Sequence, residues 1–280
     1  MNTSLKILLG ATTLTVALAT SAQAQTLMLN FRSSGGPTGA NLTNSPLHTS
    51  EPSFTDTSWN NISNSDVGSG LLYADGTAAT GVAFDLGIAN LDVSTTVDLA
   101  TTPTSANNLG LQANTGVYEG NSVGTGGIFS GSGPDRNQIG LQVTGLAAGT
   151  YEIYITGRNT NGQSTGELLY SYYAGTGVAG SNFDFSGYDS SSVSFMGSDQ
   201  TAAWVDGGNY GKITITLAAG EALNIVSNGD GGKATGSSSF GTANRGFLNS
   251  VQISMIPEPQ TWALIIGLVS LGVLALRRRK

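Results

Sequence analysis

Along most of the chain, stretches of five to seven residues with alternating apolar and polar side chains are separated by clusters of Gly, Asn, Ser and Asp. Strict alternation puts successive side chains on opposite faces of an extended chain, so each stretch predicts a short β-strand with one apolar face. Ile139, Leu141 and Val143, for instance, share a face opposite their polar neighbours. The predicted strands cover residues 27–31, 82–86, 93–99, 138–143, 151–155, 168–173, 193–196, 212–217, 221–226 and 247–253.

These strands predict an all-β fold, a two-sheet antiparallel sandwich. We find no helical period between them, and parallel sheets need crossover helices. Residues 25–255 should form this extracellular sandwich domain. The Gly-, Ser- and Asn-rich residues 121–137 and 227–244 should form long loops within it.

One stretch also indicates which kind of sandwich to expect. This stretch resembles the central hairpin of jelly-roll domains of the galactose-binding type. It consists of a strand ending near Val143, the turn of residues 145–150 and the alternating strand after it. The first strand, residues 26–31, and the last, residues 246–253, are also similar to those of such domains. The resemblance implies a jelly roll whose terminal strands pair, and it transfers no functional residues.

The N-terminus has the features of a secretory signal peptide. A short polar segment ending at Lys6 precedes a mostly apolar run, and Ala22 and Ala24 supply the small-x-small pattern that signal peptidase needs. We therefore predict a signal peptide at residues 1–24, cleaved by signal peptidase after Ala24 during export through the general secretion machinery. An uncleaved anchor is the alternative, but it would need an apolar run of about 20 residues.

The C-terminus carries a second set of targeting features. Residues 262–276 are apolar except for Ser270. A helix of this length rises about 22 Å, and it can serve as a membrane helix if flanking Arg and Trp side chains extend its reach to the interfaces. A basic end follows and should act as a membrane stop on the cytoplasmic side. It consists of Arg277, Arg278, Arg279 and Lys280.

Directly before this helix stands the tripeptide Pro257, Glu258 and Pro259. Proline fixes its own φ and disfavours helix in the preceding residue, so the tripeptide should be extended and exposed. Together with the apolar run and the basic end, it closely resembles the PEP-CTERM sorting signal, here residues 256–280. Gln260 departs in a minor way from the Ser or Thr that most often follows the tripeptide in that family.

The resemblance implies a specific partner and destination. PEP-CTERM tails are recognised by exosortases, membrane transpeptidase-like enzymes of Gram-negative bacteria that make exopolysaccharide. By this resemblance, the protein is anchored transiently through its tail, the tail is cleaved, and the body reaches the cell surface or the extracellular matrix.

Composition narrows the chemistry open to the body. The chain of 280 residues has no cysteine and one histidine, His48, so Cys/His zinc sites, thiol nucleophiles and disulfides are excluded. It has 11 Lys and Arg against 18 Asp and Glu, and four of those cations are the last four residues. The body is therefore strongly acidic and unsuited to binding nucleic acid.

Sugar binding would depend on exposed aromatic side chains. Tyr154 is predicted to face away from the core, because Ile153 and Ile155 face it. Trp59 and Trp204 each lie close to polar residues that could hydrogen-bond a sugar. These three residues are the candidates for stacking on a pyranose ring, and ordinary core packing of the tryptophans is the alternative.

Metal binding and catalysis have weaker candidates. Calcium prefers oxygen ligands on acidic loops, and the candidates are Asp135, Asp184, Asp189 and Asp230. Their spacing matches no calcium-binding loop, and the alternative is that they solvate loops. Catalysis on glycosides would need a facing pair of carboxylates. However, many carboxylates stand where a turn alone explains them, as Asp75 and Asp206 do before Gly.

Three hypotheses follow. The first is an exported, non-enzymatic surface or matrix protein, sorted by an exosortase and associated with exopolysaccharide. The second is a carbohydrate-binding module displayed at the cell surface. The third is a polysaccharide-active enzyme.

Overall fold

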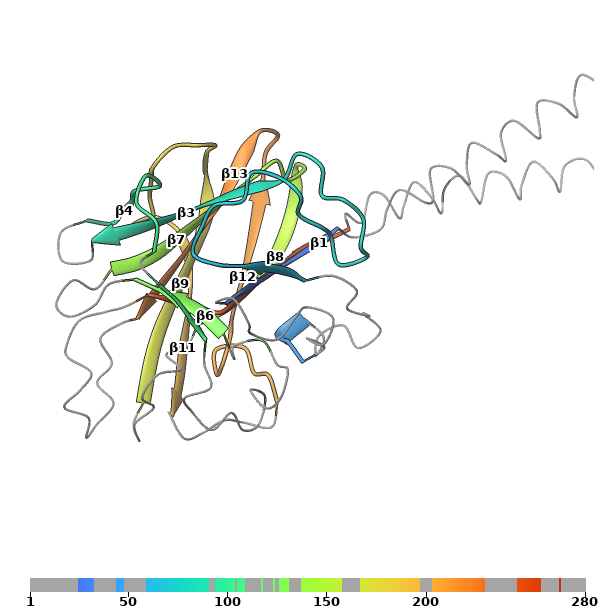
Figure 1. The fold of residues 1–280 in the computed structure, drawn as a ribbon. Helices are drawn as coiled ribbons and strands as arrows, with labels where there is room; N and C mark the ends of the chain where they lie inside the picture. The colour runs from blue at the N-terminus through green and yellow to red at the C-terminus, as the bar shows by residue number, and fades with distance from the viewer. Residues whose placement is uncertain are drawn as a thin grey trace, which may run out of the picture.

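The computed structural model describes residues 25–32, 44–47, 59–90, 94–103, 105–108, 117, 123, 126–130, 137–157, 167–196, 203–229, 246–257 and 267. Within these residues the fold is all-β (Figure 1). The strands are β1 (Thr26–Phe31), β2 (Asn60–Ile62), β3 (Ala83–Asn90), β4 (Thr96–Val97), β5 (Ser105–Asn108), β6 (Gly126–Phe129), β7 (Asn137–Thr144), β8 (Gly149–Thr156), β9 (Glu167–Val178), β10 (Phe183–Asp184), β11 (Asp189–Met196), β12 (Gly211–Leu217), β13 (Glu221–Gly229), β14 (Phe247–Leu248) and β15 (Ser250–Met255).

Two five-stranded sheets face one another. We call them sheet A, in the order β12-β8-β15-β1-β2, and sheet B, in the order β11-β9-β13-β7-β3. Neighbouring strands are antiparallel in both sheets except β1 and β2, which are parallel. The prediction of an antiparallel sandwich is therefore confirmed. Two smaller sheets, β10-β4 and β14-β6-β5, complete the described fold.

The first and last long strands pair at the centre of sheet A. β1 and β15 are antiparallel, in register from Thr26 opposite Ser254 to Asn30 opposite Ser250. On its other side β15 pairs with β8. In Figure 1 the blue N-terminal strand runs beside the red C-terminal one. The predicted pairing of terminal strands is confirmed, and the pair is interior to its sheet.

The main core lies between the two sheets and follows the predicted alternation. Leu27, Leu29 and Phe31 of β1 pack with Ile139 and Leu141 of β7 in one cluster of buried side chains. Every second residue of β12 from Gly211 onward is buried, while Thr214 and Thr216 are exposed. Period-two patterning therefore identified the side chains that face the main core.

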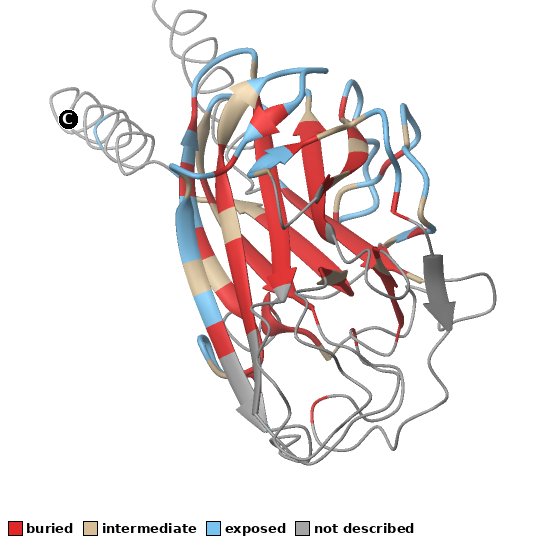
Figure 2. Ribbon diagram, turned by 90° about the vertical axis from the view of Figure 1, so that its left-hand side faces the viewer, coloured by how far each residue is buried: buried red, intermediate tan, exposed pale blue. Residues whose placement is uncertain are grey.

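The expectation of only one apolar face per strand is wrong for several strands. All six residues of β1 are buried, and β13 is buried from Ala222 to Asn228. Figure 2 shows strands whose consecutive residues are coloured as buried. The cause is that the outer faces are covered too. Val97, Phe183 and Phe185 belong to a cluster with Val226 of β13.

Two strand predictions and one loop prediction need correction. The strand predicted at residues 93–99 is described only as β4, and Val93 lies outside the described residues. The strand predicted at residues 247–253 breaks at Asn249 into β14 and β15, which belong to different sheets. The predicted loop at residues 121–137 contains β6, which pairs with β5 and β14.

Asn249 supplies the physical reason for that break. The Asn249 side-chain amide donates to the Gly126 carbonyl oxygen, while the Asn249 backbone amide donates to the Thr156 carbonyl oxygen. A Cβ on Gly127 would lie 2.6 Å from the Asn249 side chain. β6 can therefore approach only because it begins with two glycines, which carry no strand signal of their own.

The close packing of β4 on sheet B gives a stability prediction. A Cβ added to Gly140 would overlap both methyl groups of Val97. Gly140→Ala should therefore lower the free energy of unfolding, measured in urea, by about 1–3 kcal/mol, the usual range for overpacking. Combined with Val97→Ala, the loss should be smaller than the sum of the two single losses, because the shortened valine makes room.

Gly68→Ala is the matched control, because a Cβ there would meet nothing within 4 Å. Additive losses in the double variant would contradict the close approach of β4 to β7.

Candidate functional site

The three residues proposed for sugar stacking lie together, on the outer face of sheet A. Tyr154 projects from β8 on the side away from the main core. It packs in a cluster, here called the outer aromatic layer. The layer consists of Met28, Leu47, Trp59, Ala74, Val117, Val123, Tyr154, Trp204 and Tyr210.

The rings of the layer contact one another. The centroids of Tyr154 and Tyr210 are 5.9 Å apart with their planes tilted by 32°. Trp204 meets Tyr210 edge-on, with centroids 6.4 Å apart. Such geometry is typical of packed aromatic pairs in a protein interior.

The prediction that Tyr154 is exposed is wrong. The exposed fractions of Trp59, Tyr154 and Trp204 are 7%, 2% and 6%. Alternation correctly placed Tyr154 on the face opposite Ile153 and Ile155, but it gives no information about what covers that face. A sugar ring could stack on these side chains only after their cover moved away.

Hydrogen bonds join the covering segments to one another and to sheet A. Trp204 donates from Nε1 to Asn44 Oδ1 at 2.7 Å, and Asn44 donates from Nδ2 to the Val117 carbonyl oxygen at 2.9 Å. Gln252 of β15, which is fully buried, accepts from the backbone amide of Leu47 at 3.1 Å and contacts Ser45 Oγ at 2.9 Å. Burying polar groups is tolerable only when they are paired in this way.

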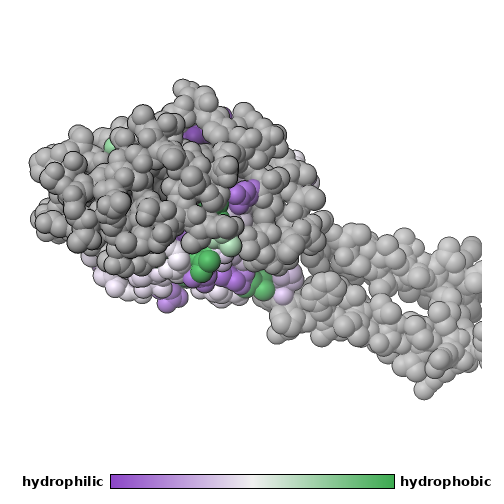
Figure 3. Space-filling model, turned by 90° about the horizontal axis from the view of Figure 1, so that it is seen from below, coloured by the Kyte–Doolittle hydropathy of each residue, from purple (hydrophilic) through white to green (hydrophobic). Residues whose placement is uncertain are grey.

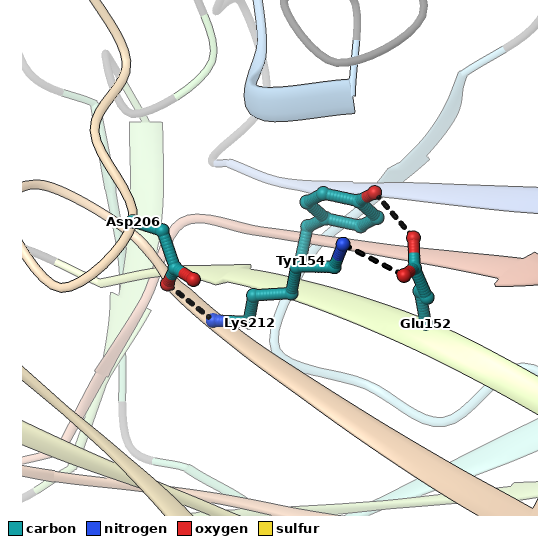
Figure 4. Close-up of polar contacts among 4 residues, drawn as sticks. All are labelled: Glu152, Tyr154, Asp206 and Lys212. Atoms are coloured by element: carbon teal, nitrogen blue, oxygen red, sulfur yellow. Dashed lines mark hydrogen bonds and ion pairs between the residues drawn. The ribbon is translucent and has the colours of Figure 1, made fainter.

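A charged pair forms the rim of the layer (Figure 4). Lys212 Nζ of β12 lies 2.7 Å from Glu152 Oε1 of β8, and both side chains are 30% exposed. Tyr154 donates from its hydroxyl to Glu152 Oε2 at 2.8 Å. The ammonium group also lies 5.3 Å from the centroid of the Tyr154 ring. The Glu152 carboxylate thus accepts a hydrogen bond from the Tyr154 hydroxyl and forms an ion pair with the Lys212 ammonium group.

This arrangement shifts the pKa values of both charged partners. Burial alone would raise the pKa of Glu152 and lower that of Lys212. Their mutual hydrogen bond and the contacts with Tyr154 outweigh burial, so the pKa of Glu152 lies below its usual value and that of Lys212 above it. The charged state of the pair is therefore the stable one.

Neither residue of the ion pair was singled out from the sequence. Lys212 lies directly opposite Tyr154 in the β8–β12 register, and Glu152 opposite Thr214. The information that would have identified this ion pair is the register between β8 and β12, two strands separated by more than fifty residues of chain. Alternation within each strand does not specify it.

The turn interpretation of two aspartates is confirmed. Asp75 Oδ1 accepts from the backbone amide and hydroxyl of Thr77, Gly76 has φ of 84°, and these hydrogen bonds lower the pKa of Asp75. Asp206 Oδ1 accepts from the backbone amide of Lys212 at 3.1 Å, and Gly207 has φ of 72°.

The acidic candidates for calcium are dispersed. Asp184 accepts from Thr95 Oγ1 and from the Ser186 amide, which lowers its pKa. Asp189 begins β11, and Asp135 and Asp230 lie outside the described residues. Among the residues the structure describes, no three His, Cys, Asp or Glu side chains are grouped closely enough to hold a metal ion.

One further carboxylate is electrostatically unusual. Burial, and then the negative charge of Asp66, raise the pKa of Asp85 on β3. Asp66 itself accepts from the backbone amide of Leu86 at 2.7 Å. Folding thus disfavours the ionised form of Asp85, so its negative charge lowers the stability of the folded protein at neutral pH.

The first and last residues of the sandwich lie close together at one end of the domain, here called the terminal pole. Met255 donates its backbone amide to the Gln25 carbonyl oxygen at 3.1 Å, and Ile256 donates to the Thr150 carbonyl oxygen at 2.8 Å. Gln25 and Pro257 are both exposed. The remaining sorting and processing residues lie outside the described residues: Ala22, Ala24, Glu258, Pro259, Arg277, Arg278, Arg279 and Lys280.

The membrane helix predicted at residues 262–276 also lies outside the described residues, apart from Gly267. In the described part of the chain, no helix is both long and apolar enough to cross a membrane. The described surface seen in Figure 3 is mainly hydrophilic or neutral, with small separate hydrophobic spots.

Comparison with known proteins gives little. No protein-family model and no curated protein matches this chain. Among solved structures, the extracellular domain of ANXUR1 from Arabidopsis thaliana is similar over 69% of this chain and 53% of its own, with 11% identity and a TM-score of 0.29. An isomalto-dextranase from Arthrobacter globiformis, complexed with panose, is similar over 61% and 23%, with 16% identity and a TM-score of 0.25.

The chain thus spans about half the length of the first of these proteins and about a quarter of the second. TM-scores of this size do not establish even a common fold, so nothing about ligands or activity follows from either protein.

The rim ion pair gives a prediction with a defined pH dependence. Glu152→Gln should lower the free energy of unfolding at neutral pH by about 1 kcal/mol or less, because the pair is partly exposed to solvent. The pKa of Glu152 is lower in the folded state. Its stabilisation is therefore present above the unfolded-state value of about 4.3 and is lost as the pH falls through the folded value.

The difference between wild type and Glu152→Gln should accordingly shrink on acidification, as measured by urea unfolding at a series of pH values. Thr214→Ala, an exposed neighbour on β12, is the control and should show no such trend. A difference that stays constant into acid would contradict the assigned role of the carboxylate.

Proposed function

We propose that this protein is an exported, non-enzymatic component of the cell surface or extracellular matrix, sorted through its C-terminal tail by an exosortase. The observation that carries the proposal is the amino-acid sequence of the C-terminal tail, in which the tripeptide Pro257 to Pro259 is followed by an apolar run and then by four cations. The signal-peptide features of residues 1–24 supply the export that such sorting requires.

The geometry of the described residues is compatible with this role. The backbone pairing of β15 ends at Ile256, and Pro257 is exposed where the tripeptide begins. Gln25, which would be the first residue after signal-peptide cleavage, lies beside Met255. The two ends of the chain that would be processed therefore emerge from the sandwich at the same place, the terminal pole. Both cleavages would then take place next to the same end of the folded body.

The acidic body suits a matrix component associated with exopolysaccharide. Ten Asp and Glu residues lie among the described residues, against Arg32 and Lys212, and like charge keeps such a protein soluble and dispersed. We do not assign carbohydrate binding to Trp59, Tyr154 or Trp204, because their rings are part of the buried outer aromatic layer.

Alanine replacement of Pro257, Glu258 and Pro259 tests the proposal. The variant should be exported normally but remain in the membrane fraction. Wild type recovered from the cell surface should have an intact mass that begins at Gln25 and ends within residues 257–261. Thr214→Ala, remote from the tail in sequence, is the matched control and should be processed like wild type.

Two outcomes would overturn the proposal. One is release of the alanine variant as efficiently as wild type. The other is a wild-type surface product that still contains Arg277 to Lys280, which would make the protein a tail-anchored membrane protein.

A further inference from the structure

The strand that precedes the tail is held on both sides. Each residue of β15 has a partner in β8, from Ser250 opposite Thr156 to Met255 opposite Tyr151. Its other edge pairs with β1. Val251, Gln252 and Ile253 are 0%, 0% and 1% exposed. The backbone of β15 is therefore paired on both edges, and its side chains from Ser250 to Ile253 are buried, while Ser254 and Met255 are partly exposed.

This protection ends abruptly at the terminal pole. Ile256 makes the last backbone hydrogen bond, from its amide to the Thr150 carbonyl oxygen at 2.8 Å. Pro257 has no backbone N–H to continue the pairing and is exposed. Ile256 is itself partly exposed, so what ends here is the backbone pairing: one peptide bond separates a residue hydrogen-bonded to the sheet from an exposed residue without such a bond.

An endopeptidase needs an extended segment whose backbone groups are free to pair with the enzyme, as in other cases of strand addition. β15 has no free edge to offer. Freeing it would remove the middle of sheet A and expose Val251 and Ile253 to water. Such an opening is close in free energy to global unfolding, whereas fraying at a chain end costs almost nothing.

We propose that the folded sandwich itself sets the upstream limit of tail removal, so that any endopeptidase that removes the tail from the folded protein cuts on the C-terminal side of Ile256. Applied to the tail-processing enzyme, this inference rests on the proposed function. The limit itself concerns the folded body and holds for any peptidase.

The same limit brings the processing enzyme close to the body. Residues 257–261 separate Ile256 from the predicted membrane segment, and five extended residues span at most about 18 Å. An enzyme that works within this interval meets the terminal pole, where Gln25 and Thr150 flank the exit of the chain. Moving the tripeptide toward the body should therefore hinder processing more than moving it away.

The first experiment needs no exosortase. The purified full-length protein in detergent is treated briefly with proteinase K, and fragments are assigned by intact mass. The fragment that contains β15 should end at Ile256 or later, while the protein still shows its cooperative unfolding transition. A β15-containing fragment that ends within residues 250–255, obtained from protein that is still folded, would overturn the inference.

The second experiment uses cells and a matched pair of variants. Deleting Met255 and Ile256 draws the tripeptide into the pairing region and should reduce release at least ten-fold. Inserting eight Gly and Ser residues between Ile256 and Pro257 should leave release within two-fold of wild type. Release of the deletion variant at the wild-type level would overturn the inference.

The two experiments separate the inference from the proposed function. If wild type is never cut in cells but proteinase K stops at Ile256, the proposed function fails and the limit stands. If the surface product ends within residues 250–255, tail removal stands and the limit fails.

Discussion

The pairing of β1 with β15 in the middle of sheet A is the contact on which the rest of the structure depends. Thr26 and Ser254 are 228 residues apart in the sequence, yet their hydroxyl oxygens are 3.1 Å apart. β15 bridges β1 and β8, so sheet A is continuous only when the chain is present as far as Met255. Forming a contact between such distant segments closes a long loop of chain, which costs conformational entropy. Folding of the body must therefore wait for its last strand.

Burial of the outer faces is the second organising feature. Val97 packs on Gly140 of sheet B, and in the outer aromatic layer Leu47, Trp204 and Tyr210 cluster with Met28 and Tyr154 of sheet A. Polar side chains serve as attachment points beneath these covers. Gln142, for example, is fully buried and accepts from the Gly180 amide while it donates to Asn224 Oδ1. The aromatic residues that would suit a sugar site are thus used to build the sandwich, and Glu152 and Lys212 close its rim.

The sequence predicted most of what depends on a single strand. β7, β8 and β12 alternate strictly, so their core-facing residues were found from period two alone. Features that depend on distant partners were not predictable in this way. The burial of Tyr154 depends on residues 44–47 and 203–210, and the break at Asn249 depends on Gly126. β2 was missed because three residues are too few to show a period. In the structure, the Asn60 side chain of β2 makes hydrogen bonds with the backbone of Met28 and of Leu72.

Native-state hydrogen exchange tests the central role of β15 most directly. If β15 holds sheet A together, the amides of β1 and β15 should exchange only through global unfolding, with the same free energy as those of β7 and β13. The measurement would follow peptides covering residues 26–31 and 250–255 in the folded protein. Exchange of the β15 amides through a local opening, while β7 and β13 stay protected, would contradict the account.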